Sequence, residues 1–301
     1  MKEIKRNSLQ AWILAARPKT LTGAVTPVLI GTALAAMDGH FEWLPALICC
    51  VFASLMQIAA NFINDLFDFL KGTDREDRLG PERACAQGWI SLQAMKTGII
   101  VTVTLACLIG CTLLFYAGWE LIIVGVLCVL FAFLYTTGPY PLSYHGLGDI
   151  AVFIFFGLIA VNLSFYVQSL YFERQVFLCS IAMGLLSVNI LMVNNYRDKE
   201  TDETSNKKTL VVLFGHKFAE YAYLLNGIAA LAVTGTIWFT TSITGYIAAI
   251  LYLSIHLKTW YAMTKKKGTE LNPILGKTAR NQLIFTLLLI LILIITRSAS
   301  F

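Results

Sequence analysis

The sequence predicts an all-α integral membrane protein with nine transmembrane helices. Hydrophobic residues make up 57% of the chain and charged residues only 14%, and the mean hydropathy is +0.69. A soluble protein carries about 25% charged residues, so this composition excludes an ordinary soluble domain. No linker rich in Pro, Gly or Ser divides the chain, and we therefore expect residues 1–301 to form a single transmembrane domain.

Nine apolar segments have lengths near the roughly 20 residues that a helix needs to cross a bilayer. They span residues 20–37, 43–64, 96–116, 119–136, 150–170, 175–195, 219–239, 243–263 and 280–297. Basic residues precede the first segment, but no small-residue cleavage site follows it. We therefore expect it to be a retained helix and not a signal peptide.

The basic residues predict the orientation. If the N-terminus is cytoplasmic, all of the 23 Lys and Arg residues except Arg174 and Arg297 fall on the cytoplasmic side. This is the distribution that the positive-inside rule describes, and it explains the net charge of +5 without a nucleic-acid partner. The longest polar connections, 69–93 and 199–217, lie on the same side, where we expect the functional site.

One acidic pattern occurs twice, 130 positions apart, at the cytoplasmic ends of the second and sixth segments. The first copy contains Asn64, Asp65, Asp68 and Asp74, and the second contains Asn194, Asn195, Asp198 and Asp202. Residues four apart share a helix face, so Asn64 and Asp68 project together, as do Asn194 and Asp198. Gly72 predicts that the first helix ends near Lys71, and we therefore expect Asp74 to belong to a loop that folds back. Two matched clusters at equivalent places suggest two repeated halves that share one ligand.

Grouped carboxylates at a membrane boundary repel one another unless cations bind between them. Mg²⁺ takes oxygen ligands: a few carboxylates hold it, and waters and substrate phosphates occupy its remaining positions. The absence of His and Cys from the clusters disfavours zinc or iron. Basic residues flank both clusters and could bind phosphate, although topology alone would also explain them. The pattern therefore predicts a Mg²⁺–diphosphate site, and the apolar interior behind it suits a polyprenyl diphosphate.

Loss of diphosphate would leave an allylic carbocation, which aromatic side chains can stabilise. Tyr135 and Tyr196 lie close to the expected mouth of the site. We assign Tyr140 and Tyr144 instead to an interfacial aromatic belt.

These motifs resemble the UbiA superfamily of membrane prenyltransferases. The two signatures of that superfamily correspond to Asn64–Asp68 with Asp74, and to Asp198–Asp202. Further runs resemble its menaquinone branch: Lys71–Asp74 followed by Asp77–Pro81, Tyr135–Leu142 followed by Gly146–Asp149, and Asn194–Asp198 followed by Lys208–Leu210. The resemblance extends from Arg17 to the last apolar segment.

The resemblance implies helices around a central cavity and a Mg²⁺-dependent enzyme with no obligate protein partner. Members of that branch transfer a polyprenyl chain to 1,4-dihydroxy-2-naphthoate with loss of CO2 and diphosphate, giving demethylmenaquinol for menaquinone biosynthesis. It also implies a bacterial inner membrane, with the mouth of the site on the cytoplasmic side.

Carried over residue by residue, the resemblance also implies roles. The expected metal site comprises Asn64, Asp65, Asp68, Asp74, Asp198 and Asp202. The expected diphosphate contacts are Lys71, Arg78, Asn195, Arg197 and Lys208. Tyr135 would face the carbocation or the acceptor, and Arg17, Lys19 and His145 are candidates for the acceptor carboxylate or phosphate. We expect the loss of CO2 itself to need no dedicated base.

Two alternatives remain open from the sequence. A sibling enzyme with 4-hydroxybenzoate, homogentisate or haem as acceptor would carry the same acidic motifs. A secondary transporter would also place acids in the membrane, although it would more often place them near the centres of its helices.

Overall fold

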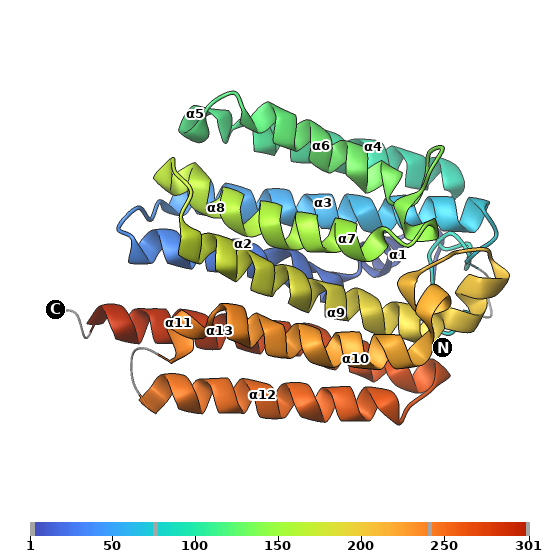
Figure 1. Cartoon of the computed structure of the whole chain (residues 1–301). Coiled ribbons are helices and arrows are strands. Elements are labelled where there is room, and N and C mark those ends of the chain that lie inside the picture. Colours follow the sequence, from blue (N-terminus) through green and yellow to red (C-terminus); the bar gives the residue numbers. More distant parts are fainter. Residues whose placement is uncertain (1–3, 75–77, 240–242, 299–301) are drawn as a thin grey trace.

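The protein is a bundle of long, roughly parallel and antiparallel helices (Figure 1). The computed structural model describes residues 4–74, 78–239 and 243–298, and within these ranges it contains no strand. Six helical stretches there are long and apolar enough to cross a membrane. The all-helical membrane fold is therefore confirmed, while the number of nine crossings and the direction of insertion stay predictions.

The α-helices and the π-helical segment η2 follow one another in chain order as α1 (Leu9–Ala16), α2 (Pro18–Met37), α3 (Trp43–Leu70), α4 (Leu92–Cys111), α5 (Leu114–Ala117), α6 (Leu121–Leu134), α7 (Gly148–Val152), η2 (Phe153–Ile159), α8 (Ala160–Ser169), α9 (Arg174–Thr204), α10 (Leu210–Val233), α11 (Gly235–Trp238), α12 (Ile243–Thr264) and α13 (Asn272–Ser298). Short 3₁₀ turns, η1 (Leu142–Tyr144) and η3 (Gly268–Leu271), precede α7 and α13. Three of these elements, α7, η2 and α8, form one continuous apolar stretch.

Helix α9 forms the centre of the bundle. Within its most apolar window 67% of the residues are buried, against 44% or less for each of the other five long apolar helices. It packs against α2, α8, α10 and α13, which surround it in Figure 1. The last turns of α9, which carry the second acidic cluster, therefore emerge from the middle of the molecule.

Helix α3 ends where the sequence predicted. It runs past the expected segment end at residue 64 to Leu70, and Gly72 follows with a positive φ of 73°. The backbone N–H of Asp74 then donates to the carbonyl of Asp68 at 3.3 Å. The prediction that Asp74 belongs to a loop that folds back onto the helix is confirmed.

The functional segments meet at one end of the bundle. Figure 1 shows the N-terminus and the connections that follow α3, α6, α9 and α12 at the same end. This grouping agrees with the alternation of basic segments in the sequence. It brings both acidic clusters and the loop around residues 135–147 together.

Glycines permit the close approach of η2 to α9, as small residues do between membrane helices. A Cβ on Gly157 would lie 2.5 Å from the Cα of Gly184 and 2.6 Å from the carbonyl oxygen of Ser180. We expect Gly157→Ala to lower the thermal unfolding temperature in detergent, because overpacking costs about 1–3 kcal/mol. Gly125→Ala in α6 is the matched control, since its added Cβ would contact no atom within 4 Å beyond the adjoining backbone of its own helix. Equal unfolding temperatures for the two variants would contradict the close packing.

Candidate active site

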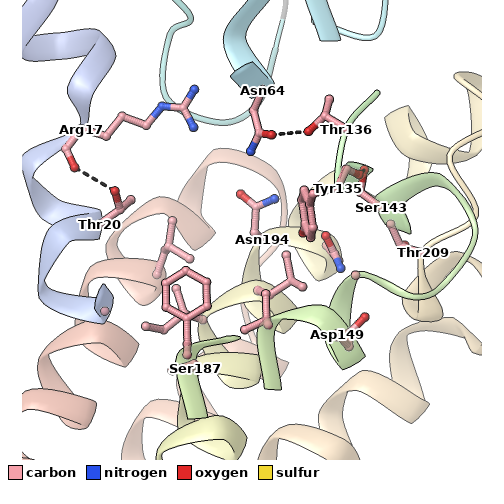
Figure 2. A pocket seen from close by; sticks show the side chains of 18 of the residues that line it. Arg17, Thr20, Asn64, Tyr135, Thr136, Ser143, Asp149, Ser187, Asn194 and Thr209 are labelled. Carbon is pink, nitrogen blue, oxygen red and sulfur yellow. Dashed lines mark hydrogen bonds between the residues drawn. The ribbon is translucent and has the colours of Figure 1, made fainter. Parts of the chain in front are cut away.

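A cavity of about 240 Å³ opens at the end of the bundle where the acidic clusters meet (Figure 2). Its deeper wall is apolar and includes Val152, Phe156 and Ile190. Six of the predicted site residues line it, Arg17, Lys19, Asn64, Asp68, Tyr135 and Asn195, together with Asn194 of the second acidic pattern. The cavity therefore joins a polar mouth to an apolar interior.

The first acidic cluster is held by the loop that follows α6. Thr136 donates its hydroxyl to the side-chain oxygen of Asn64. The hydroxyl of Tyr144 donates to Asp68 at 2.9 Å and lies 2.8 Å from the hydroxyl of Thr73. Burial, and then the Asp68 carboxylate, raise the pKa of Tyr144, which keeps its hydroxyl protonated as a donor.

The assignment of Tyr144 to an aromatic belt was therefore wrong. The 3₁₀ turn η1 folds its ring back over the mouth, where the Nζ of Lys71 lies 4.2 Å from the ring centroid. Tyr140, by contrast, is exposed.

The second acidic cluster is organised by a buried arginine. The guanidinium of Arg197 donates from Nε and Nη2 to the two carboxylate oxygens of Asp198, at 2.7 and 2.6 Å. It also donates to Asn194 at 2.8 Å and to Asn272 of α13 at 2.9 Å. Arg197 is 2% exposed and does not line the cavity. In this structure its guanidinium therefore holds Asp198 in place, and a contact between Arg197 and phosphate stays a prediction.

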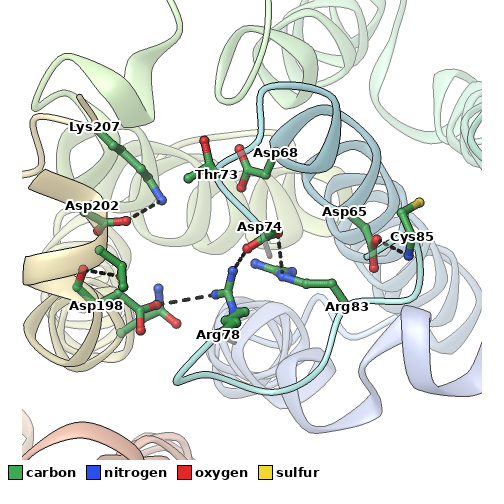
Figure 3. Close-up of polar contacts among 12 residues, drawn as sticks. Asp65, Asp68, Thr73, Asp74, Arg78, Arg83, Cys85, Asp198, Asp202 and Lys207 are labelled. Carbon is green, nitrogen blue, oxygen red and sulfur yellow. Dashed lines mark hydrogen bonds and ion pairs between the residues drawn. The ribbon is translucent and has the colours of Figure 1, made fainter. Parts of the chain in front are cut away.

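Arg78 connects the two clusters across the mouth (Figure 3). It forms an ion pair with Asp74, and its Nη2 lies 3.4 Å from Asp198 Oδ2. Arg83, which lines the cavity, also binds Asp74, with Nε 3.0 Å from Oδ2. The loop after α3 thus closes over the end of α9 through its arginines.

Asp65 does not join this group. Its carboxylate is fully buried and accepts the backbone N–H groups of Ala84 and Cys85, both at 2.9 Å. Of the described cationic side chains, Arg17 forms its ion pair, with Nη2 3.8 Å from Asp65 Oδ2. Asp65 was expected in the metal site, but in this structure both of its carboxylate oxygens bind the backbone at residues 84 and 85. One helical position, about 100°, separates it from Asn64 on the cavity side.

Oxygen donors suitable for Mg²⁺ surround the mouth. Asp68, Asp74, Asp198 and Asp202 are all at least nine-tenths buried, and Asp202 Oδ2 has no hydrogen-bond partner among the described residues. Such a donor set fits Mg²⁺ chemically. Within the described ranges, however, no three acidic, His or Cys side chains converge on one point. Cationic groups, above all Arg78, stand between the carboxylates instead.

Two predicted contacts lie away from the cavity. Lys208 is exposed, whereas its neighbour Lys207 lines the cavity with Nζ 3.5 Å from Asp202. His145 is also exposed, and its ring stacks on Tyr140 at 3.7 Å between centroids. Neither Lys208 nor His145 can therefore contact a ligand in the cavity without moving.

A polar wall beside Arg17 was missed from the sequence. Asn61 donates to Thr20 at 3.0 Å and accepts from Gln57 at 3.1 Å, and Gln57 and Thr20 line the cavity. The available signal was two amides four residues apart inside an apolar helix, where polar side chains usually have a function. Thr136, Tyr144 and Asp149 were likewise not assigned to the site.

Comparison with known proteins agrees with this arrangement. Residues 24–273 match the UbiA prenyltransferase family. The chain is 35% identical to the 1,4-dihydroxy-2-naphthoate octaprenyltransferase of Escherichia coli (strain K12), over 100% of both chains. It is 34% identical to the protein of the same name from Mycobacterium tuberculosis, over 93% of this chain and 95% of that one.

Solved structures give the same fold. The structure of a UbiA homolog from Archaeoglobus fulgidus bound to DMAPP and Mg²⁺ has a TM-score of 0.67 at 13% identity, covering 94% of this chain and 99% of that one. The family match over most of the chain and the relatives above 30% identity confirm the resemblance found in the motifs. The chain is a member of the UbiA prenyltransferase family.

Proposed function

We propose that this protein transfers a polyprenyl chain from polyprenyl diphosphate to 1,4-dihydroxy-2-naphthoate, with Mg²⁺ as cofactor and with release of diphosphate and CO2. The observation that carries the proposal is the meeting of two acidic clusters, from α3 and α9, at the polar mouth of an apolar cavity. Full-length relatives named for this acceptor support it. The product would be demethylmenaquinol for menaquinone biosynthesis.

The diphosphate would bind at the mouth. Asp68, Asp74, Asp198 and Asp202, with Asn64, would hold Mg²⁺, which would neutralise charge on the departing diphosphate. Lys71, Arg78, Asn195, Arg83 and Lys207 are the cavity or mouth groups that would contact phosphate oxygens. Arg78 and Arg83 each contact one oxygen of Asp74 in this structure, and they would exchange that carboxylate for phosphate oxygens, which Arg can bind bidentately.

The apolar part of the cavity would receive the prenyl group and exclude water from the allylic cation. Tyr135 lines this region and offers an aromatic face to the cation. At the polar wall, Arg17 and Lys19 would bind the acceptor carboxylate. Burial lowers the pKa of Arg17 to about 10, so its guanidinium remains charged at neutral pH.

The site would open on the cytoplasmic side of a bacterial inner membrane. The support is the positive-inside count, because the N-terminus and the long basic connections share one end of the bundle. Both substrates would then reach the site from the cytoplasm or from the adjoining leaflet.

The test is prenyl transfer by the purified full-length protein in detergent. Polyprenyl diphosphate and Mg²⁺ are supplied with 1,4-dihydroxy-2-naphthoate, 4-hydroxybenzoate, homogentisate or haem, and products are identified by mass spectrometry. We expect the naphthoate alone to give a prenylated product that lacks the carboxyl group. Chelation of Mg²⁺ should stop the reaction and added Mg²⁺ should restore it. Product from another acceptor alone would overturn the assignment, and vesicle flux without transfer would favour a transporter.

A further inference from the structure

A buried carboxylate in the cavity wall has no role in the mouth. Asp149, the second residue of α7, is 6% exposed and lines the cavity (Figure 2). Its Oδ1 is buried and has no hydrogen-bond partner among the described residues. A buried polar atom left without a partner costs about 1–3 kcal/mol, so its retention in a ligand cavity points to a partner supplied by the ligand.

The surroundings of Asp149 favour a neutral hydrogen-bond donor over a cation. No described Lys or Arg lies within ion-pair distance of Asp149, although the same cavity is lined by Arg17, Lys19, Arg83 and Lys207. The adjacent Gly148 lies against Tyr135, because a Cβ on that glycine would be 3.3 Å from the tyrosine hydroxyl. The carboxylate thus lies beside the aromatic group expected at the reaction centre.

The cavity therefore has two chemically different walls. In Figure 2, Arg17 and Thr20 lie on one side of the view, and Tyr135 and Asp149 lie on the other. A hydroxylated aromatic acid offers a carboxylate for the cationic wall and a hydroxyl for the acidic wall. An acceptor bound between the two walls would have its orientation fixed by charge and by hydrogen-bond direction together.

We propose that Asp149 accepts a hydrogen bond from a ring hydroxyl of the acceptor and takes its proton when the ring attacks the prenyl group. The inference rests on the proposed function and adds the residue that orients and activates the acceptor. A carboxylate at a cavity wall beside the aromatic ring is a suitable general base.

The chemistry balances without a further reactant. The bond between the prenyl carbon and diphosphate oxygen breaks, and a new bond forms between that carbon and the ring carbon that bears the carboxylate. The hydroxyl electrons form a ring carbonyl, and the proton passes to Asp149. The bond to the carboxylate then breaks, its electrons restore the aromatic ring, CO2 leaves, and Asp149 returns the proton to the ring oxygen. Loss of CO2 itself needs no base.

The experiment compares Asp149→Asn with the wild-type protein, using Mg²⁺, polyprenyl diphosphate and 1,4-dihydroxy-2-naphthoate. We expect kcat/KM for the naphthoate to fall by about 10²-fold or more, with KM for polyprenyl diphosphate unchanged. The rate of the variant should recover as pH rises, because solvent then deprotonates the hydroxyl. Asp38→Asn, an exposed acid that pairs with Tyr171 far from the cavity, is the matched control and should behave as wild type.

A second acceptor distinguishes loss of the hydrogen bond to the acceptor hydroxyl from a general loss of enzyme activity. The methyl ether of the ring hydroxyl ortho to the carboxylate cannot donate a proton, so we expect Asp149→Asn to cost no further activity with it. A variant equal to wild type with the naphthoate, or equally impaired with both acceptors, would overturn the proposal. If Asp149→Asn does not fold, Asp149→Ala, which also removes the carboxylate, is compared with the wild-type protein instead, and an equal loss with the naphthoate and its methyl ether would overturn the proposal.

The naphthoate assignment can be wrong while the role of Asp149 is right. If the wild-type protein uses another phenolic acceptor and not the naphthoate, the same comparison is made with that acceptor and its methyl ether. A loss confined to the free phenol would then support Asp149 while the naphthoate assignment falls.

Discussion

Asp68→Ala is expected to abolish prenyl transfer while the protein remains folded. Asp68 lines the cavity at the end of α3 and is 6% exposed. Its loss removes an anionic oxygen from the group that would organise Mg²⁺ and diphosphate. We expect kcat to fall on the order of 10³-fold, as when a single preorganised electrostatic contact to a transition state is removed.

The fold should tolerate this change because the partner of Asp68 keeps another contact. The hydroxyl of Tyr144, which donates to Asp68, also lies 2.8 Å from the hydroxyl of Thr73. Tyr144→Phe is the matched variant, since it removes the donor and leaves the carboxylate. Loss of such a supporting contact costs about 10–100-fold, so we expect a smaller effect. The measurements are kcat and the Mg²⁺ dependence; an Asp68→Ala enzyme within tenfold of wild type would contradict the metal assignment.

Local rules predicted the gathering of the acidic clusters. Helical periodicity puts Asn64 and Asp68 on one face, Gly72 ends the helix, and the basic segments place both clusters at one end of the bundle. These signals are contained within a few residues or in the composition of whole segments. A single sequence is therefore enough to detect them.

The roles of Asp65 and Arg197 could not be predicted in this way. Asp65 binds backbone groups at positions 84 and 85, and Arg197 binds Asn272, 75 positions further along the chain. Which polar side chain faces the cavity and which anchors a loop depends on these distant partners. Both residues belong to the motifs, but in the folded protein Asp65 binds loop backbone and Arg197 binds the Asp198 carboxylate.

A backbone turn after α9 decides which of two adjacent lysines, Lys207 or Lys208, lies near the acidic cluster. Asn206 has a positive φ of 53°, and the N–H of Lys207 donates to the carbonyl of Asp202 at 2.8 Å. This turn directs Lys207, and not Lys208, toward the acidic cluster. An Asn just beyond a helix is a known signal for a left-handed cap, so this detail was within reach of sequence reasoning.

Breaking the buried pair of Arg197 and Asp198 is expected to destabilise the protein strongly. The pair is bidentate, and the arginine side chain is fully buried. Among the described residues, Asp198→Ala leaves that cation with only the amide oxygens of Asn194 and Asn272. Removing one partner of a buried ion pair costs about 3–5 kcal/mol. We therefore expect both Asp198→Ala and Arg197→Met to lower the thermal unfolding temperature in detergent.

The double variant Arg197→Met with Asp198→Leu separates anchoring from chemistry. Replacing both charges with apolar side chains leaves no unpaired buried ion, so much of the stability should return, and the double-variant cycle gives a coupling energy directly. Activity should stay lost, because the carboxylate proposed to hold Mg²⁺ is missing. A single Asp198→Ala variant as stable as wild type would refute the anchoring role of Arg197. A stable, active double variant would instead show that Asp198 serves the fold alone, and the site would then rest on Asp68, Asp74 and Asp202.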